Sequence, residues 1–372
     1  MLPSRPSLVY LFVLLCPVVS MSPGCRMPTV HTQSCVRGDV TTEVAGNVNG
    51  NVQAHVNVEP PSPVNNALPL VEMPVLAGGS PSCAKIALID VDGVLLNQDL
   101  TGLMSMGENP VALFREKLEY VQRNGQYRAV ILRINSPGGG VTATDIMWRD
   151  LRQFKEATGL PVVACLMDLG TGGAYYLATG ADAIVAHPTT ITGGMGVILN
   201  AYNLQDAMNM WNIVGVPIKS GSKIDIGSPV REMSEECRGI LQAVADHFHH
   251  RFQDVVLRSR TQYKPIDKEG KEKDFDGRIF TAEVALEKHL IDSIGYLDDA
   301  VEIACQHASS SDASVVMLHR PNDHARSPYA VTPNTPLQGS LLPINIPGLQ
   351  RAELPTFFYM WQPLPGMERL GR

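Results

Sequence analysis

The sequence predicts an α/β fold: a layered, parallel β-sheet with flanking helices, in a single main domain. Two short apolar runs, residues 129–134 and 162–167, are rich in β-branched side chains and are typical of buried strands. A glycine-rich turn follows each run, at residues 138–140 and 170–173, and a helical pattern follows each turn. Two successive strand–turn–helix units favour parallel pairing. Functional residues of such sheets lie at the carboxyl ends of the strands, where both turns fall.

Proline content separates the folded body from the two ends of the chain. Eleven of the 27 prolines lie in residues 1–81 and nine in residues 321–372, so the middle of the chain is the part suited to a folded domain. Arg5 precedes an apolar stretch, which is typical of a secretory leader. We therefore predict a signal peptide or signal anchor at 1–22, a disordered linker at 23–81, the main domain at 82–305 and a proline-rich tail at 306–372.

Composition and charge exclude several classes of function. The net charge is −7 and no basic block is present, which argues against nucleic-acid binding. None of the seven cysteines forms a Cys-x-x-Cys pair, so no structural zinc site is predicted. Asp90 and Asp92 form a single Asp-x-Asp beside Gly93, a pattern more typical of a strand end than of a metal site. We therefore predict no metal and no cofactor.

The first half of the domain contains signals for one strand and two helices. Residues 86–91 are predicted to form a strand, and Asn109 is predicted to cap the helix that follows it. After the first glycine turn, Thr142 or Thr144 is expected to cap a second helix, which ends at Gly159.

The second half continues with a helix that begins near Gly172. It carries Tyr175 and Tyr176, which either line a substrate groove or pack the helix against the sheet. Residues 199–222 are expected to form a helix and an edge strand, the strand at 214–219. A long helix capped by Ser234 is predicted to bury a stripe of apolar side chains spaced four residues apart: Ile240, Val244, Phe248, Phe252 and Val256.

Two short helices and an apolar cluster complete the chain. Thr281 is predicted to cap the first short helix, and the second covers residues 297–303. Residues 357–361, Phe-Phe-Tyr-Met-Trp, form an apolar cluster within the proline-rich tail. This cluster either docks on the body or a neighbouring subunit, or touches a membrane surface. Five residues are too few to span a bilayer.

Gly138 and Gly139 are candidate donors to a developing oxyanion. Glycine allows the backbone to approach a ligand closely, and a helix N-terminus offers unpaired N–H groups. The alternative is a tight connection that carries no chemistry. A phosphate-binding loop is disfavoured, because neither turn has a Gly-Lys-Ser/Thr ending or the spacing of a dinucleotide fingerprint.

Four blocks of sequence carry a resemblance to a known family. They are LRINSPGGGVTA at 132–143, DLGTGGAYY at 168–176, ITGGMGVI at 191–198 and DGRIFTAEVALEKHLIDSIGYLDDAV at 276–301. KIALIDVDGVL at 85–95 and GSPVREMSEE at 227–236 extend the match. On these blocks the chain resembles the signal peptide peptidase A (protease IV) family of serine peptidases. The resemblance implies a ClpP/crotonase-like fold and, in most members, a Ser–Lys dyad.

Both dyad positions are substituted in this chain. The family's serine lies four residues after the aspartate of the second block, where this sequence has Gly172. The family's lysine lies in a segment shortly before Gly-Ser-Pro, where this sequence has Ile224. Thr171 and Lys223 are the neighbouring residues, and a threonine–lysine pair is chemically able to act as nucleophile and base.

Three classes of function therefore compete. The first is a catalytically impaired peptidase homologue that binds peptides, and the second is an active peptidase with a displaced Thr171/Lys223 dyad. The third is an acyl-CoA enzyme on the same fold, for which no adenine or pyrophosphate site is recognisable in the sequence. The first is the preferred interpretation.

The resemblance also implies a ligand path, partners and a location. A substrate strand would lie along Gly138, Gly139, Gly140 and Val141, with oxyanion donors from that turn, and Gly173 is included among the candidate binding residues. Peptides such as spent signal peptides are the implied substrates. The implied assembly is a homo-oligomer or a complex with active paralogues, with a membrane surface as a further partner. Together with the leader, the resemblance implies an exported protein that is periplasmic or anchored facing the periplasm.

Overall fold

The computed structural model describes residues 44–46, 52–54, 68–78, 84–99, 108–263, 273–310, 312–321, 327–330 and 357–361. The chain divides into two compact units, residues 1–60 and 61–372. In the first unit, β1 (Val44–Gly46) pairs antiparallel with β2 (Val52–Ala54). These strands lie inside the range 23–81 that was predicted to be a disordered linker. The predicted leader, residues 1–22, lies outside the described residues.

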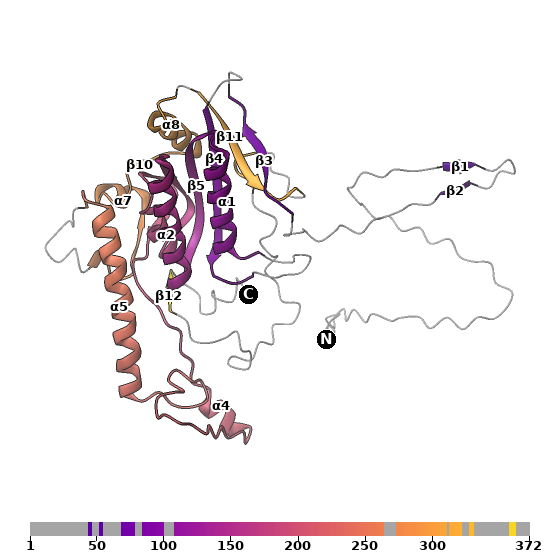
Figure 1. The fold of residues 1–372 in the computed structure, drawn as a ribbon. Helices are drawn as coiled ribbons and strands as arrows, with labels where there is room; N and C mark the ends of the chain where they lie inside the picture. The colour runs from indigo at the N-terminus through magenta and orange to yellow at the C-terminus, as the bar shows by residue number, and fades with distance from the viewer. Residues whose placement is uncertain are drawn as a thin grey trace, which may run out of the picture. The chain divides into compact units, whose positions relative to one another are not determined.

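A central sheet organises the second unit (Figure 1). Its strand order is β10-β7-β6-β5-β4-β11-β3, and all neighbours in this order are parallel except β11 and β3. This arrangement confirms the predicted layered, parallel α/β fold. The strands are β3 (Val71–Leu76), β4 (Ala84–Leu95), β5 (Tyr127–Gly140), β6 (Val162–Thr171), β7 (Ala183–Ala186), β10 (Ser293–Ile294) and β11 (Ala313–His319).

The sheet extends beyond both predicted boundaries of the main domain. β3 precedes residue 82 and β11 follows residue 305, so the range 82–305 omits two strands of the sheet. The four residues Val315–Leu318 are at most 2% exposed, because β11 lies between β4 and β3. Residues 306–372 were assigned to the tail because of their overall proline content. An average over so long a range does not reveal the short apolar run that forms β11.

Helices cover the sheet, and several begin and end where predicted. The Asn109 side chain accepts hydrogen bonds from the N–H groups of Val111 and Ala112, and Gly125 ends that helix in the left-handed region. The helices are α1 (Pro110–Asn124), α2 (Val141–Thr158), α3 (Gly173–Ala178), α4 (Gln205–Met210), α5 (Glu235–Ser259), α7 (Ala282–Glu287) and α8 (Leu297–His307).

Two local predictions are wrong. Helix α2 is capped by Gly140 rather than by Thr142 or Thr144, because β5 continues through the glycines and passes directly into the helix. The Thr144 side chain is buried. The strand predicted at residues 214–219 does not form, and this segment is exposed. Pro217 has no N–H to donate, and none of the strands in the described ranges pairs with this segment.

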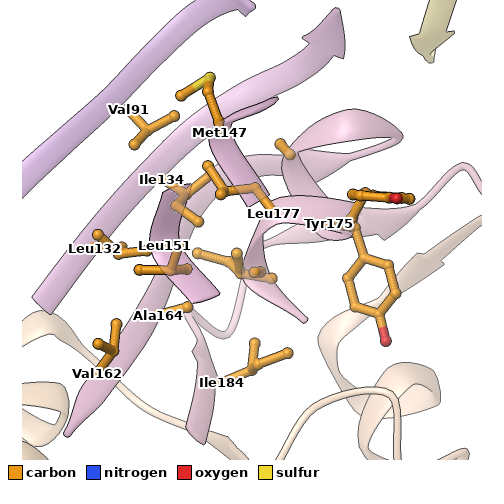
Figure 2. Close-up of a cluster of buried hydrophobic side chains, with 14 of the residues drawn as sticks. Val91, Leu132, Ile134, Met147, Leu151, Val162, Ala164, Tyr175, Leu177 and Ile184 are labelled. Atoms are coloured by element: carbon orange, nitrogen blue, oxygen red, sulfur yellow. The ribbon is translucent and has the colours of Figure 1, made fainter. Parts of the chain in front are cut away.

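The core lies on both faces of the sheet. Alternate residues of β5 point to opposite sides: Leu132 and Ile134 pack on one face, and Ile131 packs on the other. Figure 2 shows Leu132 and Ile134 among side chains of α2, including Met147 and Leu151. Each of these residues is at most 1% exposed, and burial of such a side chain contributes about 1.5–3 kcal/mol.

A buried ion pair fixes α1 against the sheet. Lys117 of α1 bonds the carboxylate of Asp90 in β4, and the two side chains are 2% and 4% exposed. Charges removed from water in this way are tolerated only when both remain paired.

Helix α5 is buried along only part of its length. Phe252 and Val256 are fully buried, as predicted, but Ile240 is 43% exposed. Figure 1 shows the reason, since α5 continues past the sheet toward α4. The predicted apolar stripe is therefore core only in the C-terminal half of the helix.

Candidate functional site

The carboxyl ends of β5 and β6 meet at a strand-to-helix turn. Gly172 lies between the end of β6 and the start of α3, with φ 55° and ψ −122°. Its N–H donates to the carbonyl of Gly193, 2.8 Å away, in β8 (Ile191–Gly193), which pairs with β6. Gly172 therefore lies at the carboxyl end of β6. This is the position at which the family resemblance implies a nucleophile.

A strand from the C-terminal region lies against this edge. β12 (Phe358–Met360; Figure 1) pairs antiparallel with β5. In this pairing Tyr359 lies opposite Gly139. The N–H of Val141 donates to the Phe357 carbonyl at 3.1 Å, and the N–H of Trp361 donates to the Pro137 carbonyl at 3.1 Å. The apolar cluster at 357–361 therefore docks on the body, which was one of its predicted alternatives.

β12 is held on its second side as well. Ile198 and Phe358 exchange two backbone hydrogen bonds, of 3.0 Å and 2.9 Å. The segment thus lies between the end of β5 and the backbone at Ile198. An extended peptide in this place is recognised mainly through its main chain.

The carbonyl oxygen of Tyr359 lies in a space bordered by Gly138, Gly172 and Gly173, which we call the cradle. A side chain at any of these three positions would approach the oxygen closely. An ideal Cβ would stand 2.1 Å from this oxygen at Gly138, 2.5 Å at Gly172 and 3.2 Å at Gly173. At Gly172 the Cβ would also stand 2.8 Å from the carbonyl carbon of Tyr359. The docked strand therefore occupies the space that a side chain at position 172 would need.

The predicted ligand path coincides with the position of β12. Gly138, Gly139 and Gly140 pair with Met360, Tyr359 and Phe358 in turn, and Val141 supplies the next hydrogen bond. Of the predicted oxyanion donors, Gly138 directs its N–H to the Ser136 hydroxyl at 3.1 Å.

Thr171 and Lys223 are not joined by a hydrogen bond. Thr171 is fully buried, and its hydroxyl has no hydrogen-bond partner in the described part of the chain. Lys223 instead bonds the carboxylate of Glu236 in the first turn of α5. This bond raises the pKa of Lys223, whereas a lysine base needs a lowered pKa. Ile224, the position to which the resemblance assigns the family's lysine, is 74% exposed.

An aromatic pocket receives the side chain of Tyr359. The ring stacks on Tyr176 of α3 with centroids 5.4 Å apart, and it lies 4.8 Å from the ring of Phe252 in α5. The Tyr359 hydroxyl donates to the Phe248 carbonyl at 2.7 Å. Tyr176 is therefore a contact of the docked strand, while Tyr175 is fully buried and donates to the Leu290 carbonyl.

The aspartates of β4 serve as ion-pair partners. Asp92 lies 3.2 Å from the guanidinium of Arg133, and Asp90 is held by Lys117. Within the described ranges, no group of three or more His, Cys, Asp or Glu side chains could hold a metal ion.

Asp92 makes the stability of the protein depend on pH. Burial, and then the neighbouring Asp90 carboxylate, raise its pKa to about 6. A carboxyl group with a raised pKa stabilises the fold when protonated, so this contribution is present below pH ~4 and is lost as the pH rises through ~6. We expect the free energy of unfolding of the wild type, relative to Asp92→Asn, to fall by about 2 kcal/mol between pH 4 and pH 7. Urea unfolding of both chains at the two pH values measures this, and parallel pH profiles would contradict it.

Several contacts of the site were missed by sequence reasoning. Ile198, Phe248 and Phe252 were read as core or were not singled out, yet all of them contact β12. Tyr176 had been given two alternatives, a substrate groove or packing against the sheet, and it contacts β12. The apolar cluster flanked by prolines was the available signal, but nothing in its composition says where it docks. As for the membrane, none of the helices in the described part of the chain is both long enough and apolar enough to cross a bilayer.

Known proteins share this chain's sequence pattern. Residues 154–311 match the model of peptidase family S49. A putative signal peptide peptidase SppA from Enterococcus faecium is 28% identical over 232 residues, which cover 62% of this chain and 66% of the relative. The chloroplastic serine protease SPPA of Arabidopsis thaliana is 33% identical over 211 residues, which cover 56% of this chain and 30% of the relative. The chain thus spans less than two thirds of the length of these two relatives.

A third relative is matched over more of its length. A putative protease of Synechocystis is 36% identical over 203 residues, which cover 54% of this chain and 70% of the relative. The range matched by the family model, residues 154–311, includes Gly172 and the strand-to-helix turn. The chain therefore belongs to peptidase family S49.

Proposed function

We propose that this member of peptidase family S49 binds peptides in an extended conformation and does not cleave them. The observation that carries the proposal is the pairing of β12 with the end of β5, with the Tyr359 carbonyl held among Gly138, Gly172 and Gly173. This supports the proposal, because the resemblance implies a nucleophile at position 172 and an ideal Cβ there would stand 2.8 Å from the Tyr359 carbonyl carbon. The space between the end of β5 and the backbone at Ile198, which we call the groove, offers backbone hydrogen bonds to an extended strand on both sides.

The chemistry needed to cut the strand is missing from the same place. Gly172 has no side chain to act as a nucleophile, and a hydroxyl at Thr171 is buried without a basic partner among the described residues. Loss of a nucleophile typically lowers turnover by about a million-fold. Binding of an extended peptide without its hydrolysis is the function that the geometry supports best.

The segment docked in the site, residues 357–361, allows hydrolysis to be tested without an added substrate. An active site with a displaced Thr171/Lys223 dyad would add water across the bond between Tyr359 and Met360, since the Tyr359 carbonyl already lies in the cradle. We expect the intact mass of the incubated full-length protein to stay unchanged, and a peptide of sequence PTFFYMWQP (residues 355–363) to remain whole. Cleavage that disappears in both Thr171→Ala and Lys223→Ala would establish the dyad instead.

Binding is tested on a full-length chain whose groove has been freed. Tyr359→Ala removes the side chain that anchors β12, so fluorescently labelled PTFFYMWQP can take its place. In this background Val141→Pro is expected to weaken binding at least tenfold, because it removes the N–H that bonds the strand. Proline suits this position, which is the first residue of α2 after an extended Gly140. Val141→Ala keeps the N–H and is the matched control; equal affinity of the two variants would count against strand pairing.

Partners and location are further parts of the proposal. Exposed apolar side chains gather between residues 202 and 224, among them Trp211, Val216 and Ile218, and these support assembly into a homo-oligomer or with active paralogues. Peptides such as spent signal peptides are the proposed ligands, which would be met at a membrane surface. The apolar leader supports an exported, periplasmic or membrane-anchored protein.

A further inference from the structure

Helices α1 and α2 lie side by side on one face of the sheet (Figure 1). A cavity of about 230 Å³ opens between them. Leu118 and Phe154 give it an apolar base, since they line it and are only 3% and 4% exposed. This cavity is separate from the groove, because none of its lining residues belongs to β5, β12 or the turn at Gly172. Its polar lining residues are Arg115, Glu119, Gln122, Asp150 and Gln153.

The Asp150 carboxylate lines this cavity without a hydrogen-bond partner. Its Oδ2 atom is shielded from solvent, and no donor among the described residues reaches it. Burial raises the pKa of Asp150, because the loss of water disfavours the charged form of the carboxyl group. A carboxylate in this state gains more from a bound cation than a fully solvated carboxylate does.

Arg115 supplies the opposite charge from the other helix. Its Nε donates to Glu119 at 3.3 Å, and Glu119 also accepts from Arg123 at 2.7 Å, so the Glu119 carboxylate is already paired. The two terminal nitrogens of Arg115 donate to no residue in the described part of the chain. Arg115 and Asp150 therefore line one cavity with opposite charges and do not form an ion pair with each other.

We propose that this cavity binds a free α-amino acid with an aliphatic side chain, of which leucine is the model. The α-ammonium group bonds the Asp150 carboxylate, and the α-carboxylate bonds the terminal nitrogens of Arg115. The aliphatic side chain lies on Leu118 and Phe154. A zwitterion of this kind satisfies both charged groups at once, and the volume is below the roughly 300 Å³ at which pockets for larger ligands begin.

The proposal does not depend on peptide binding by the groove, so either can fail without the other. The competing arrangement is a direct ion pair between Arg115 and Asp150, formed by rotation of the two side chains. It would use the same charges and leave no site for a ligand. The two arrangements differ in whether the protein binds an added amino acid.

Isothermal titration calorimetry of the full-length chain with leucine tests the assignment. Two analogues each lack one charge: 4-methylpentanoate has no ammonium group, and 3-methylbutylamine has no carboxylate. Glycine keeps both charges and lacks the aliphatic side chain. We expect leucine to bind with a Kd of about 1 mM or below, as suits a ligand of so few atoms. Each analogue is expected to bind at least about tenfold more weakly, because one contact is lost.

Two substitutions remove the charges from the cavity. Asp150→Asn and Arg115→Gln are each expected to weaken leucine binding at least about tenfold, since a charge-assisted hydrogen bond becomes a neutral one or is lost. Glu156→Gln and Arg152→Gln are the matched controls, because they neutralise an exposed ion pair of α2 outside the cavity. We expect these controls to change the Kd by less than about twofold. A thermal unfolding curve checks that each variant is folded.

Three results would overturn the proposal. A wild-type Kd for leucine weaker than about 10 mM would mean that the cavity is no amino-acid site, as the direct ion pair requires. Equal leucine binding by the wild type, Asp150→Asn and Arg115→Gln would place the ligand elsewhere on the protein. Binding of 3-methylbutylamine as tight as that of leucine would show that the cavity holds a cation and not an amino acid.

Discussion

Replacing Gly139 by alanine is expected to lower the free energy of unfolding by about 3 kcal/mol. An ideal Cβ at this position would stand 2.0 Å from the Leu95 carbonyl oxygen and 2.6 Å from the Leu95 carbonyl carbon and nitrogen. These are backbone atoms of a paired strand, so the methyl group can be accommodated only by separating β4 from β5. Urea unfolding of the purified chain measures the loss.

The control for this prediction is a glycine with free space around it. Gly239 lies in α5 with nothing within 4 Å of an added Cβ. Gly239→Ala is expected to stabilise the chain by up to about 1 kcal/mol, because alanine is the better helix former. If Gly139→Ala unfolded at the same urea concentration as the wild type, the close pairing of β4 and β5 at the glycine turn would be wrong.

Removing the charge of Lys117 is expected to cost about 3–5 kcal/mol in the free energy of unfolding. Lys117→Met keeps the length of the side chain but leaves the Asp90 carboxylate buried without its ammonium partner. The cost comes from the loss of the ion pair at a buried carboxylate and not from lost apolar contact. Chemical denaturation of the variant, compared with the wild type, gives the magnitude.

A double substitution identifies the origin of that cost. Lys117→Met with Asp90→Leu removes both charges, and we expect it to recover most of the stability lost in the single variant. Lys155→Met offers a partly exposed comparison, since its partner Asp182 is 36% exposed and an exposed pair contributes only up to about 1 kcal/mol. A double variant as unstable as Lys117→Met alone would show that packing around α1, rather than charge, sets the effect.

Signals that act over a few residues were readable from the sequence. Asn109 caps α1 because its side chain reaches the N–H groups two and three positions later, and Gly159 ends α2 because it adopts a positive φ that other residues disfavour. The two buried strands and the glycine turns were found for the same reason. Each rests on chemistry within a short window of chain.

Signals that depend on distant partners were not readable. β11 is a strand because β4 and β3 flank it, whereas residues 214–219 pair with no other strand of the described part of the chain. The path along Gly138–Val141 was predicted, but its occupant was not. Tyr176, Phe252 and Tyr359 are far apart in the sequence, and only the folded sheet brings their rings together.

The pairing of β12 with β5 has a consequence for the order of folding. Gly139 and Tyr359 are separated by more than two hundred residues, and contacts that close long loops form late. On a ribosome, β4, β5 and β6 emerge before residue 357 is synthesised. In a newly made chain the groove is therefore formed before β12 can fill it. During this period another polypeptide can bind in the groove without competition from residues 357–361.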